Sequence, residues 1–159
     1  MKSLRGFGAG VCLALVLAGC SDTPGTNDKP GVYSPLIVNI SADSVHTGIS
    51  SHAGYNAAKG GVNGLTTGLA FEFAKHNITV NSVSPGGIAT PEIREMLDPN
   101  SEVYKKHRIV DVRTVMAMIP IGRFVEMNEV AALTAFLTYE ETRGITGQIY
   151  SVNGGQWMM

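Results

Sequence analysis

A tyrosine and a lysine four residues apart, Tyr55 and Lys59, are the pair in this sequence best suited to proton transfer. On a helix, positions i and i+4 share one face, so the phenol and the ammonium would lie side by side. A phenol has a reference pKa of about 10, and a nearby positive charge lowers that pKa because it favours phenolate. The spacing therefore predicts a pair that exchanges a proton with a substrate oxygen. Many helices carry the same spacing without a catalytic role, so the surroundings must support the prediction.

The elements that would position this pair alternate between strand and helix. Short apolar, β-branched runs predict strands at residues 36–40, 78–83 and 148–152. Between the first two strands, residues 55–76 carry apolar side chains at spacings of three and four, which predicts an amphipathic helix. The residues on its apolar face are expected to be Ala58, Val62, Leu65, Leu69 and Phe73.

The remaining segments complete an α/β pattern. Residues 42–54 are polar and rich in Gly and Ser, which predicts a loop, and residues 84–91 carry the Pro and Gly of a turn. The mixed segment 92–118 predicts one or two short helices over a cleft. Residues 129–139 predict a helix with Val130, Leu133, Phe136 and Leu137 on one face. Strands alternating with helices indicate a parallel sheet between helical layers.

Length and composition favour one folded unit and limit its partners. The chain has 159 residues, of which 44% are hydrophobic and 16% are charged, which excludes intrinsic disorder for most of it. A formal net charge of −1 and the lack of a basic run argue against a nucleic-acid partner. The four histidines lack metal-ligand spacing, so no metal site is predicted.

The first 20 residues have the layout of an export signal. Two early cations precede a mostly apolar stretch, residues 8–19, which is shorter than the roughly 20 residues of a membrane-spanning helix. The run Leu-Ala-Gly-Cys ending at Cys20 resembles a bacterial lipobox, in which the cysteine is lipidated. That resemblance implies a signal peptide at 1–20, a linker at 21–35 and a membrane-anchored lipoprotein outside the cytoplasm. The alternative is a buried strand or helix of a cytoplasmic protein.

From residue 36 onward the sequence resembles the short-chain dehydrogenase/reductase family. Six motifs occur in the order that the family has them: Val38-Asn39-Ile40-Ser41, Tyr55-x-x-x-Lys59, the segment 78–90 containing Pro85-Gly86, Pro120-Ile121-Gly122-Arg123, the helix beginning Glu129-Val130-Ala131, and Ile145-Thr146-Gly147-Gln148 with Val152-Asn153-Gly154-Gly155. The resemblance implies a Rossmann-like, doubly wound parallel sheet. It also implies NAD(P)-dependent hydride transfer between a hydroxyl and a carbonyl of a small-molecule alcohol or ketone.

The resemblance also assigns roles to single residues. Tyr55 would be the general acid/base, and Lys59 would lower its pKa and hold the nicotinamide ribose. Ile88 and Thr90, which follow Pro85-Gly86, would hold the nicotinamide carboxamide. The residues expected to contact NAD or NADP are therefore Tyr55, Lys59, Pro85, Gly86, Ile88 and Thr90.

The serine that polarises the substrate oxygen in the family has no direct counterpart here. It precedes the family's tyrosine by about 13 residues, and that position is Ala42. Ser41 and Ser44 flank this position. We expect Ser41, at the strand end, to be the catalytic hydroxyl, and Ser44 is the alternative.

By the same resemblance, residues 36–159 correspond to the C-terminal half of the family's domain, so the fold is expected to be truncated. The absent N-terminal mononucleotide-binding half would carry the glycine-rich pyrophosphate turn and the residue that selects NAD or NADP. Its absence would leave a sheet edge unpaired.

Two functions remain open at this point. The first is an oxidoreductase of short-chain dehydrogenase type, for which residues 58–63 are similar to cyclic diol dehydrogenases. The second is a non-catalytic tethered lipoprotein, or an inactive fragment, that keeps part of the enzyme fold. Family members associate through the helix that bears the Tyr and Lys and through the C-terminal strand. A homo-oligomer is therefore expected.

Overall fold

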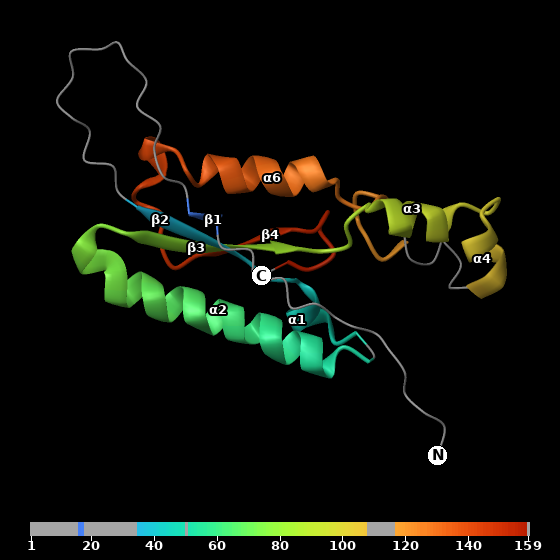
Figure 1. Cartoon of the computed structure of the whole chain (residues 1–159), viewed down its shortest axis with the longest axis horizontal. Coiled ribbons are helices and arrows are strands. Elements are labelled where there is room, and N and C mark those ends of the chain that lie inside the picture. The colour runs from blue at the N-terminus through green and yellow to red at the C-terminus, as the bar shows by residue number, and fades with distance from the viewer. Residues whose placement is uncertain (1–15, 18–34, 50, 108–116, 159) are drawn as a thin grey trace, which may run out of the picture.

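Parallel strands form the centre of the molecule, with one long helix on each side (Figure 1). The computed structural model describes residues 16–17, 35–49, 51–107 and 117–158. Strands β2 (Leu36–Ile40), β3 (Thr79–Pro85) and β4 (Ile149–Val152) run parallel, in the sheet order β1-β2-β3-β4. Helix α2 (Ala53–Phe73) covers one face of the sheet and α6 (Met127–Phe136) covers the other. The expected α/β fold with a parallel sheet is thus confirmed.

Short elements complete the chain between these strands and helices. Helices α3 and α4 extend beyond the end at which β3 finishes (Figure 1). The expectation of one or two short helices after the turn is confirmed by these two. The short elements are α1 (Ser44–Thr47), η1 (Ala74–His76), α3 (Pro91–Leu97), α4 (Glu102–His107) and η2 (Glu140–Thr142).

The strand register brings three motif segments to one edge of the sheet. Ile40 pairs with Val83, and Pro85 pairs with Val152, so all three parallel strands end close together. Two further bonds extend these ladders past the strand ends, from Ser41 N–H to the Val83 carbonyl (2.8 Å) and from Gly86 N–H to the Val152 carbonyl (3.0 Å). In open α/β sheets, ligands bind outside the carboxyl ends of the strands, so this edge is the place to look for a site.

The apolar core lies between the sheet and α6. Val38, Val83 and Leu137 are at most 2% exposed and form its centre. Seven partly buried side chains pack around them, namely Leu36, Ile40, Val130, Leu133, Ile145, Tyr150 and Val152. The predicted inward side chains of α6 are confirmed at Val130, Leu133 and Leu137, whereas the prediction for Phe136 is wrong because its ring is 47% exposed.

Helix α6 begins two residues earlier than expected because of a capping box. Glu126 is its N-cap, and its side chain accepts from the backbone N–H of Glu129. In return, the Glu129 carboxylate accepts from the Glu126 N–H at 2.7 Å. These reciprocal bonds satisfy N–H groups that would otherwise lack a partner in the first turn.

The predicted apolar face of α2 is partly wrong. The side chains that face the sheet are Lys59, Val62, Thr66 and Ala70. Leu65 lies 46% exposed and Phe71 88% exposed. Thr66 is fully buried and accepts a hydrogen bond from Asn39 Nδ2 at 2.9 Å, so part of this interface is polar. Periodicity counted only apolar residues and therefore missed the polar side chains on the buried face.

Strand β1 (Val16–Leu17) pairs with the outer edge of β2. It runs antiparallel, with Val16 opposite Val38 and Leu17 opposite Ile37. The expectation that this edge stays unpaired is therefore wrong at these two positions. The pairing matches the alternative in which the apolar run contributes a strand. Cys20 and nearly all of the predicted linker lie outside the described residues, and no helix in the described ranges is long and apolar enough to span a bilayer.

Two predicted boundaries also shifted at the edge that carries the site. Residues 42–54 were expected to form a loop, but they contain the single-turn helix α1. The turn expected at 84–91 begins later, because Ser84 and Pro85 continue β3 alongside β4. Pairing with a neighbouring strand, which local sequence does not reveal, extends β3 through the proline.

Candidate active site

Tyr55 and Lys59 lie one turn apart at the start of α2, as their spacing predicts. Lys59 is 6% exposed, and its Nζ donates a hydrogen bond of 2.9 Å to the Ile40 carbonyl at the end of β2. The same Nζ lies 5.9 Å from the centre of the Tyr55 ring. The helix therefore holds a cation beside a half-buried phenol at the carboxyl edge of the sheet.

The pKa of the Tyr55 phenol is raised from its ordinary value by burial. The cause is loss of water around the oxygen, which disfavours the charged phenolate. This direction is opposite to the lowering expected from Lys59. The lysine ammonium is held by the Ile40 carbonyl and lies over the ring. At neutral pH Tyr55 is a neutral phenol, which suits it to donate a proton.

The two candidate serines both hydrogen bond to α2. Ser41 is 2% exposed, and its Oγ donates to the Lys59 carbonyl at 3.2 Å. Ser44 Oγ donates to Asn56 Oδ1 at 2.7 Å, next to Tyr55 in sequence. Ala42 lies between them, buried, at the position of the family's serine. In this arrangement Ser41 ties β2 to α2, and Ser44 ties α1 to the first turn of α2.

Aromatic side chains surround the same region. The rings of His52 and Tyr55 lie edge to face, with 5.8 Å between ring centres. On α1, His46 stacks on Trp157 with ring centres 5.5 Å apart and planes 8° from parallel. Nothing in the local sequence links Trp157 to position 46, so this contact could not be predicted from the sequence.

Gly86, after β3, sits where a side chain has no room. A Cβ placed there would lie 2.8 Å from the Cβ of Asn153 and 3.0 Å from its Cα. At Gly87 a Cβ would meet the Phe124 ring at 2.5 Å. The two glycines therefore let this backbone pass between β4 and the segment before α6. The structure places Pro85 and Gly86 at the end of the sheet.

Ile88 and Thr90 point their side chains to structural partners. Ile88 forms an isolated parallel bridge with Val125, and its side chain lines an apolar groove of about 590 Å³ beside α6. Thr90 is the N-cap of α3, where its Oγ1 accepts from the Ile93 N–H at 3.3 Å. Contact of Ile88 with a carboxamide would therefore involve its backbone.

The described residues fit the nicotinamide end of a dinucleotide. The Lys59 ammonium, the Tyr55 phenol and the backbone after Pro85 belong to the same edge, and an ammonium is a donor that ribose hydroxyls can accept from. The described ranges contain no Gly-x-Gly-x-x-Gly turn of the kind that binds pyrophosphate. Within them, no group of three His, Cys, Asp or Glu side chains is placed to hold a metal ion.

Comparison with known sequences identifies relatives over this region. Residues 31–156 match the family described as Enoyl-(Acyl carrier protein) reductase. A 2,3-dihydroxy-2,3-dihydro-p-cumate dehydrogenase of Pseudomonas putida is 46% identical over 123 residues, which cover 77% of this chain and 44% of that protein. A 3-oxoacyl-[acyl-carrier-protein] reductase of Staphylococcus aureus is 37% identical over 125 residues, covering 79% of this chain and 46% of that protein.

Solved structures agree with these relatives. A short-chain dehydrogenase/reductase from Brucella melitensis, described as a glucose/ribitol dehydrogenase, superposes with a TM-score of 0.65 at 30% identity. The match covers 79% of this chain and 46% of that one. The chain thus spans about half the length of the relatives it matches.

Proposed function

Because this chain belongs to the short-chain dehydrogenase/reductase family, we propose that it supplies the residues that transfer the proton in an oxidoreductase that interconverts a hydroxyl and a carbonyl. The observation that carries the proposal is the Tyr55–Lys59 pair at the carboxyl edge of the sheet, with the Lys59 ammonium fixed by the Ile40 carbonyl. A bound NAD or NADP would accept or supply the hydride. Tyr55 would give its phenolic proton to the substrate oxygen during reduction and take it back during oxidation.

The remaining groups at this edge would orient the reactants. The Lys59 ammonium would donate to the nicotinamide ribose, and the backbone of Pro85, Gly86 and Ile88 lies at the same end of the sheet. Both serine hydroxyls donate to groups on α2, but Ser44 is partly exposed and lies beside the turn that bears Tyr55, whereas Ser41 is 2% exposed. The geometry therefore favours Ser44 as the hydroxyl beside the substrate, with Ser41 in a supporting position.

We propose a cyclic diol as the substrate class. The support is the cumate diol dehydrogenase, which at 46% identity exceeds the 37% of the 3-oxoacyl reductase. The aromatic rings of His52, His46 and Trp157 near the start of α2 would suit a flat ring. A small-molecule ketone would be the substrate of the reverse reaction.

We also propose self-association and a membrane anchor. The outward side of α2 exposes Leu65 and Phe71, which would be covered if two copies packed along this helix. The anchor rests on the Cys20 motif alone and would place the chain outside the cytoplasm if the signal is used. A cytoplasmic protein that keeps residues 1–20 is the alternative.

A cofactor titration of the full chain tests the proposed function. Nicotinamide fluorescence should report binding of NADH or NADPH, and an oxidation assay should use the p-cumate dihydrodiol, with acetoacetyl-CoA reduction as the contrasting reaction. Tyr55→Phe should lower turnover by about 10²- to 10⁴-fold while cofactor binding is retained. Tyr139→Phe, at a ring that is 58% exposed, is the matched control. If neither cofactor binds at millimolar concentration, the chain is a non-catalytic lipoprotein or an inactive fragment.

A further inference from the structure

Asp43 is a buried carboxylate that the proposed proton transfer does not use. It is 1% exposed and directly follows Ala42. Although Asp43 stands at the N-cap position of α1, its side chain makes no capping bond. It is directed instead at the end of β4, where Oδ1 accepts from Ser151 Oγ at 2.9 Å and Oδ2 accepts from Asn153 Nδ2.

These contacts join two parts of the chain more than a hundred residues apart, since Asp43 is 108 positions from Ser151 and 110 from Asn153. The Asp43 backbone N–H also donates to the Pro85 carbonyl at 2.9 Å. Among the described residues Asp43 forms no ion pair, so neutral donors alone surround the carboxylate. A buried charge is costly unless hydrogen bonds compensate it, so these donors fix where the carboxylate can lie.

Asn153 connects Asp43 to the C-terminal turn, residues 153–157, by hydrogen bonds. Its Nδ2 donates to the Trp157 carbonyl at 2.7 Å, and its Oδ1 accepts from the Gly155 N–H at 2.8 Å. Gly154 and Gly155 have φ values of 65° and 85°, in the left-handed region that glycine adopts without strain. The turn therefore has a defined shape, with its first residue held by Asp43.

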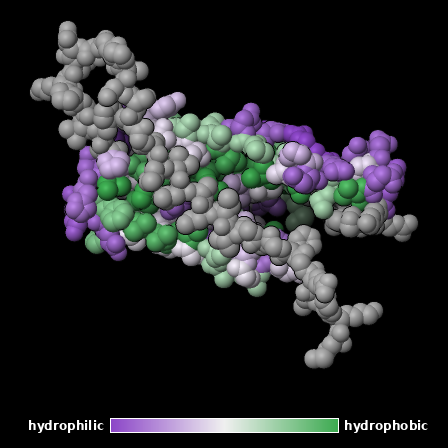
Figure 2. Space-filling view, in the orientation of Figure 1, coloured by the Kyte–Doolittle hydropathy of each residue, from purple (hydrophilic) through white to green (hydrophobic). Residues whose placement is uncertain are grey.

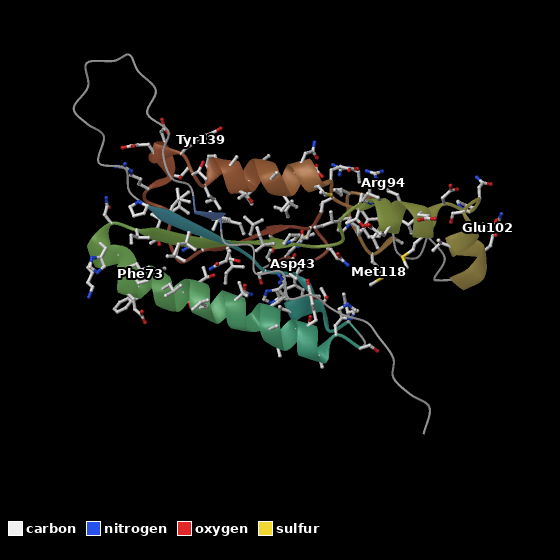
Figure 3. The ribbon with its side chains drawn as sticks, viewed as in Figure 1. Asp43, Phe73, Arg94, Glu102, Met118 and Tyr139 are labelled. Atoms are coloured by element: carbon white, nitrogen blue, oxygen red, sulfur yellow. The ribbon has the colours of Figure 1, made fainter. Side chains whose placement is uncertain are left out.

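The other end of this turn meets α1. The indole of Trp157 is 37% exposed and stacks on His46 of α1. Ser44 of α1 bonds to Asn56, the residue after Tyr55. Figure 3 shows Asp43 at the centre of the molecule, between the sheet and the helices below it. Asp43 thus lies at the centre of a set of contacts that runs from β4 through Trp157 to the start of α2.

We infer that Asp43 is a positioning residue whose carboxylate holds the C-terminal turn, so that Trp157 stacks on His46 and the two rings form one wall of the substrate pocket beside Tyr55. The role of these two rings in the substrate pocket rests on the proposed function. The hold on the turn does not, because it follows from the hydrogen bonds and the ring stack alone.

The single tryptophan of the chain makes the hold measurable without any activity. Asp43→Asn keeps the size of the side chain but removes its charge and replaces one of the two acceptor oxygens, which Ser151 and Asn153 share, by an amide donor. The expected result is a red-shifted Trp157 emission and a roughly twofold rise in quenching by acrylamide, because the ring leaves His46. Asp98→Asn is the matched control, since Asp98 is exposed and its carboxylate accepts from the nearby Asn100 N–H. A folded Asp43→Asn protein with unchanged emission and quenching would overturn the inference.

A second variant keeps the inference testable if Asp43→Asn does not fold. Asn153→Ala removes the same contact from the other side and also frees the Trp157 carbonyl, so the same emission change is expected. His46→Ala should reproduce the change while leaving the Asp43 contacts in place. If Asn153→Ala folds and leaves Trp157 unchanged, the hold on the turn is refuted.

Kinetics on an active preparation test whether the rings of Trp157 and His46 line the substrate pocket. Asp43→Asn should raise KM for the diol by on the order of tenfold, with a smaller change in kcat and an unaltered pH profile. An emission change without a rise in KM would overturn the assignment of the wall to the substrate pocket. If cofactor fails to bind at all, the proposed function fails, while the fluorescence result still decides the role of Asp43.

Discussion

The ammonium of Lys59 donates a hydrogen bond to the carbonyl oxygen of Ile40, with 2.9 Å between the two atoms. This bond joins the second turn of α2 to the last residue of β2, so the helix is fixed along its length relative to the sheet edge. Because Lys59 is held in this way, Tyr55, one turn earlier, is fixed as well. The position of Tyr55 at the sheet edge therefore depends on this hydrogen bond between the Lys59 side chain and the Ile40 backbone.

Replacing Lys59 by methionine should destabilise the fold. Met matches the length of the lysine stem but leaves the Ile40 carbonyl without this donor, and loss of a hydrogen bond to a charged group costs about 1.5–3 kcal/mol. Urea unfolding followed by circular dichroism measures the change. Lys75→Met is the control, because Lys75 lies exposed at the end of the same helical segment and should change stability by less than about 0.5 kcal/mol. Equal effects of the two variants would contradict the prediction.

The raised pKa of Tyr55 predicts opposite pH behaviour for the two reaction directions. Burial keeps the phenol neutral at neutral pH, so reduction, which needs the proton, should not improve as pH rises toward 10. Oxidation, which needs the phenolate, should become faster over the same range. The difference in absorbance at 295 nm between the wild type and Tyr55→Phe gives the titration of Tyr55 alone. A midpoint below the ordinary tyrosine value in the absence of cofactor would show that Lys59, and not burial, dominates.

Gly86→Ala should destabilise the chain by about 1–3 kcal/mol, because its new Cβ would overlap the Asn153 backbone. Gly87→Ala should cost less, since the atoms it meets belong to the Phe124 ring, which can turn aside. Gly64→Ala is the matched control: among the described residues, no atom outside the adjoining helix backbone lies within 4 Å of its Cβ position on α2, and the change should stabilise the helix by up to about 1 kcal/mol. Thermal unfolding of the three variants should give this order, and a tolerated Gly86→Ala would contradict the packing described.

The Arg123–Glu129 pair should make stability sensitive to acid. Hydrogen bonds from Arg123 and from the Glu126 N–H lower the pKa of Glu129 to about 2. The folded state thus holds the carboxylate charged where the unfolded state would take up a proton. The contribution is present above the ordinary carboxyl pKa and is lost as pH falls through about 2.

Glu129→Gln checks this prediction by urea unfolding at several pH values between 7 and 2 in low salt. The difference in unfolding free energy between wild type and variant should shrink as the pH falls. Glu72→Gln, at an exposed position on α2, is the control and should show no such trend. A difference that stays constant down to pH 2 would argue against the pair as its source.

Lipidation should depend on Cys20 alone. In a bacterial host, radiolabelled palmitate should enter the wild-type chain but not Cys20→Ser, whereas Cys12→Ser should still be labelled because that residue lies inside the predicted signal. Label in Cys20→Ser, or none in the wild type, would leave the apolar run as part of the folded chain, in keeping with the pairing of Val16–Leu17 with β2.

The apolar surface shows where local pattern fails. Figure 2 shows hydrophobic side chains gathered along the middle of the molecule and hydrophilic ones at its ends. The exposed Leu65 and Phe71 belong to α2, where periodicity predicted a buried Leu65. Periodicity identified the helix correctly, but it could not tell which of its faces the sheet would cover, because that choice depends on partners distant in sequence.

By itself, the sequence determined the kinds of element, their order, and the pairing of Tyr55 with Lys59, because all three follow from spacing along one chain. Only the tertiary structure decided the environment of those groups. Burial raises the Tyr55 pKa, and the Ile40 carbonyl at the end of β2 accepts a hydrogen bond from the Lys59 ammonium. The hydroxyls of Ser41 and Ser44 donate hydrogen bonds to groups on α2, and the Asp43 carboxylate accepts one from Asn153, 110 residues away. The physical reason is that desolvation and hydrogen bonding depend on which atoms come together in space.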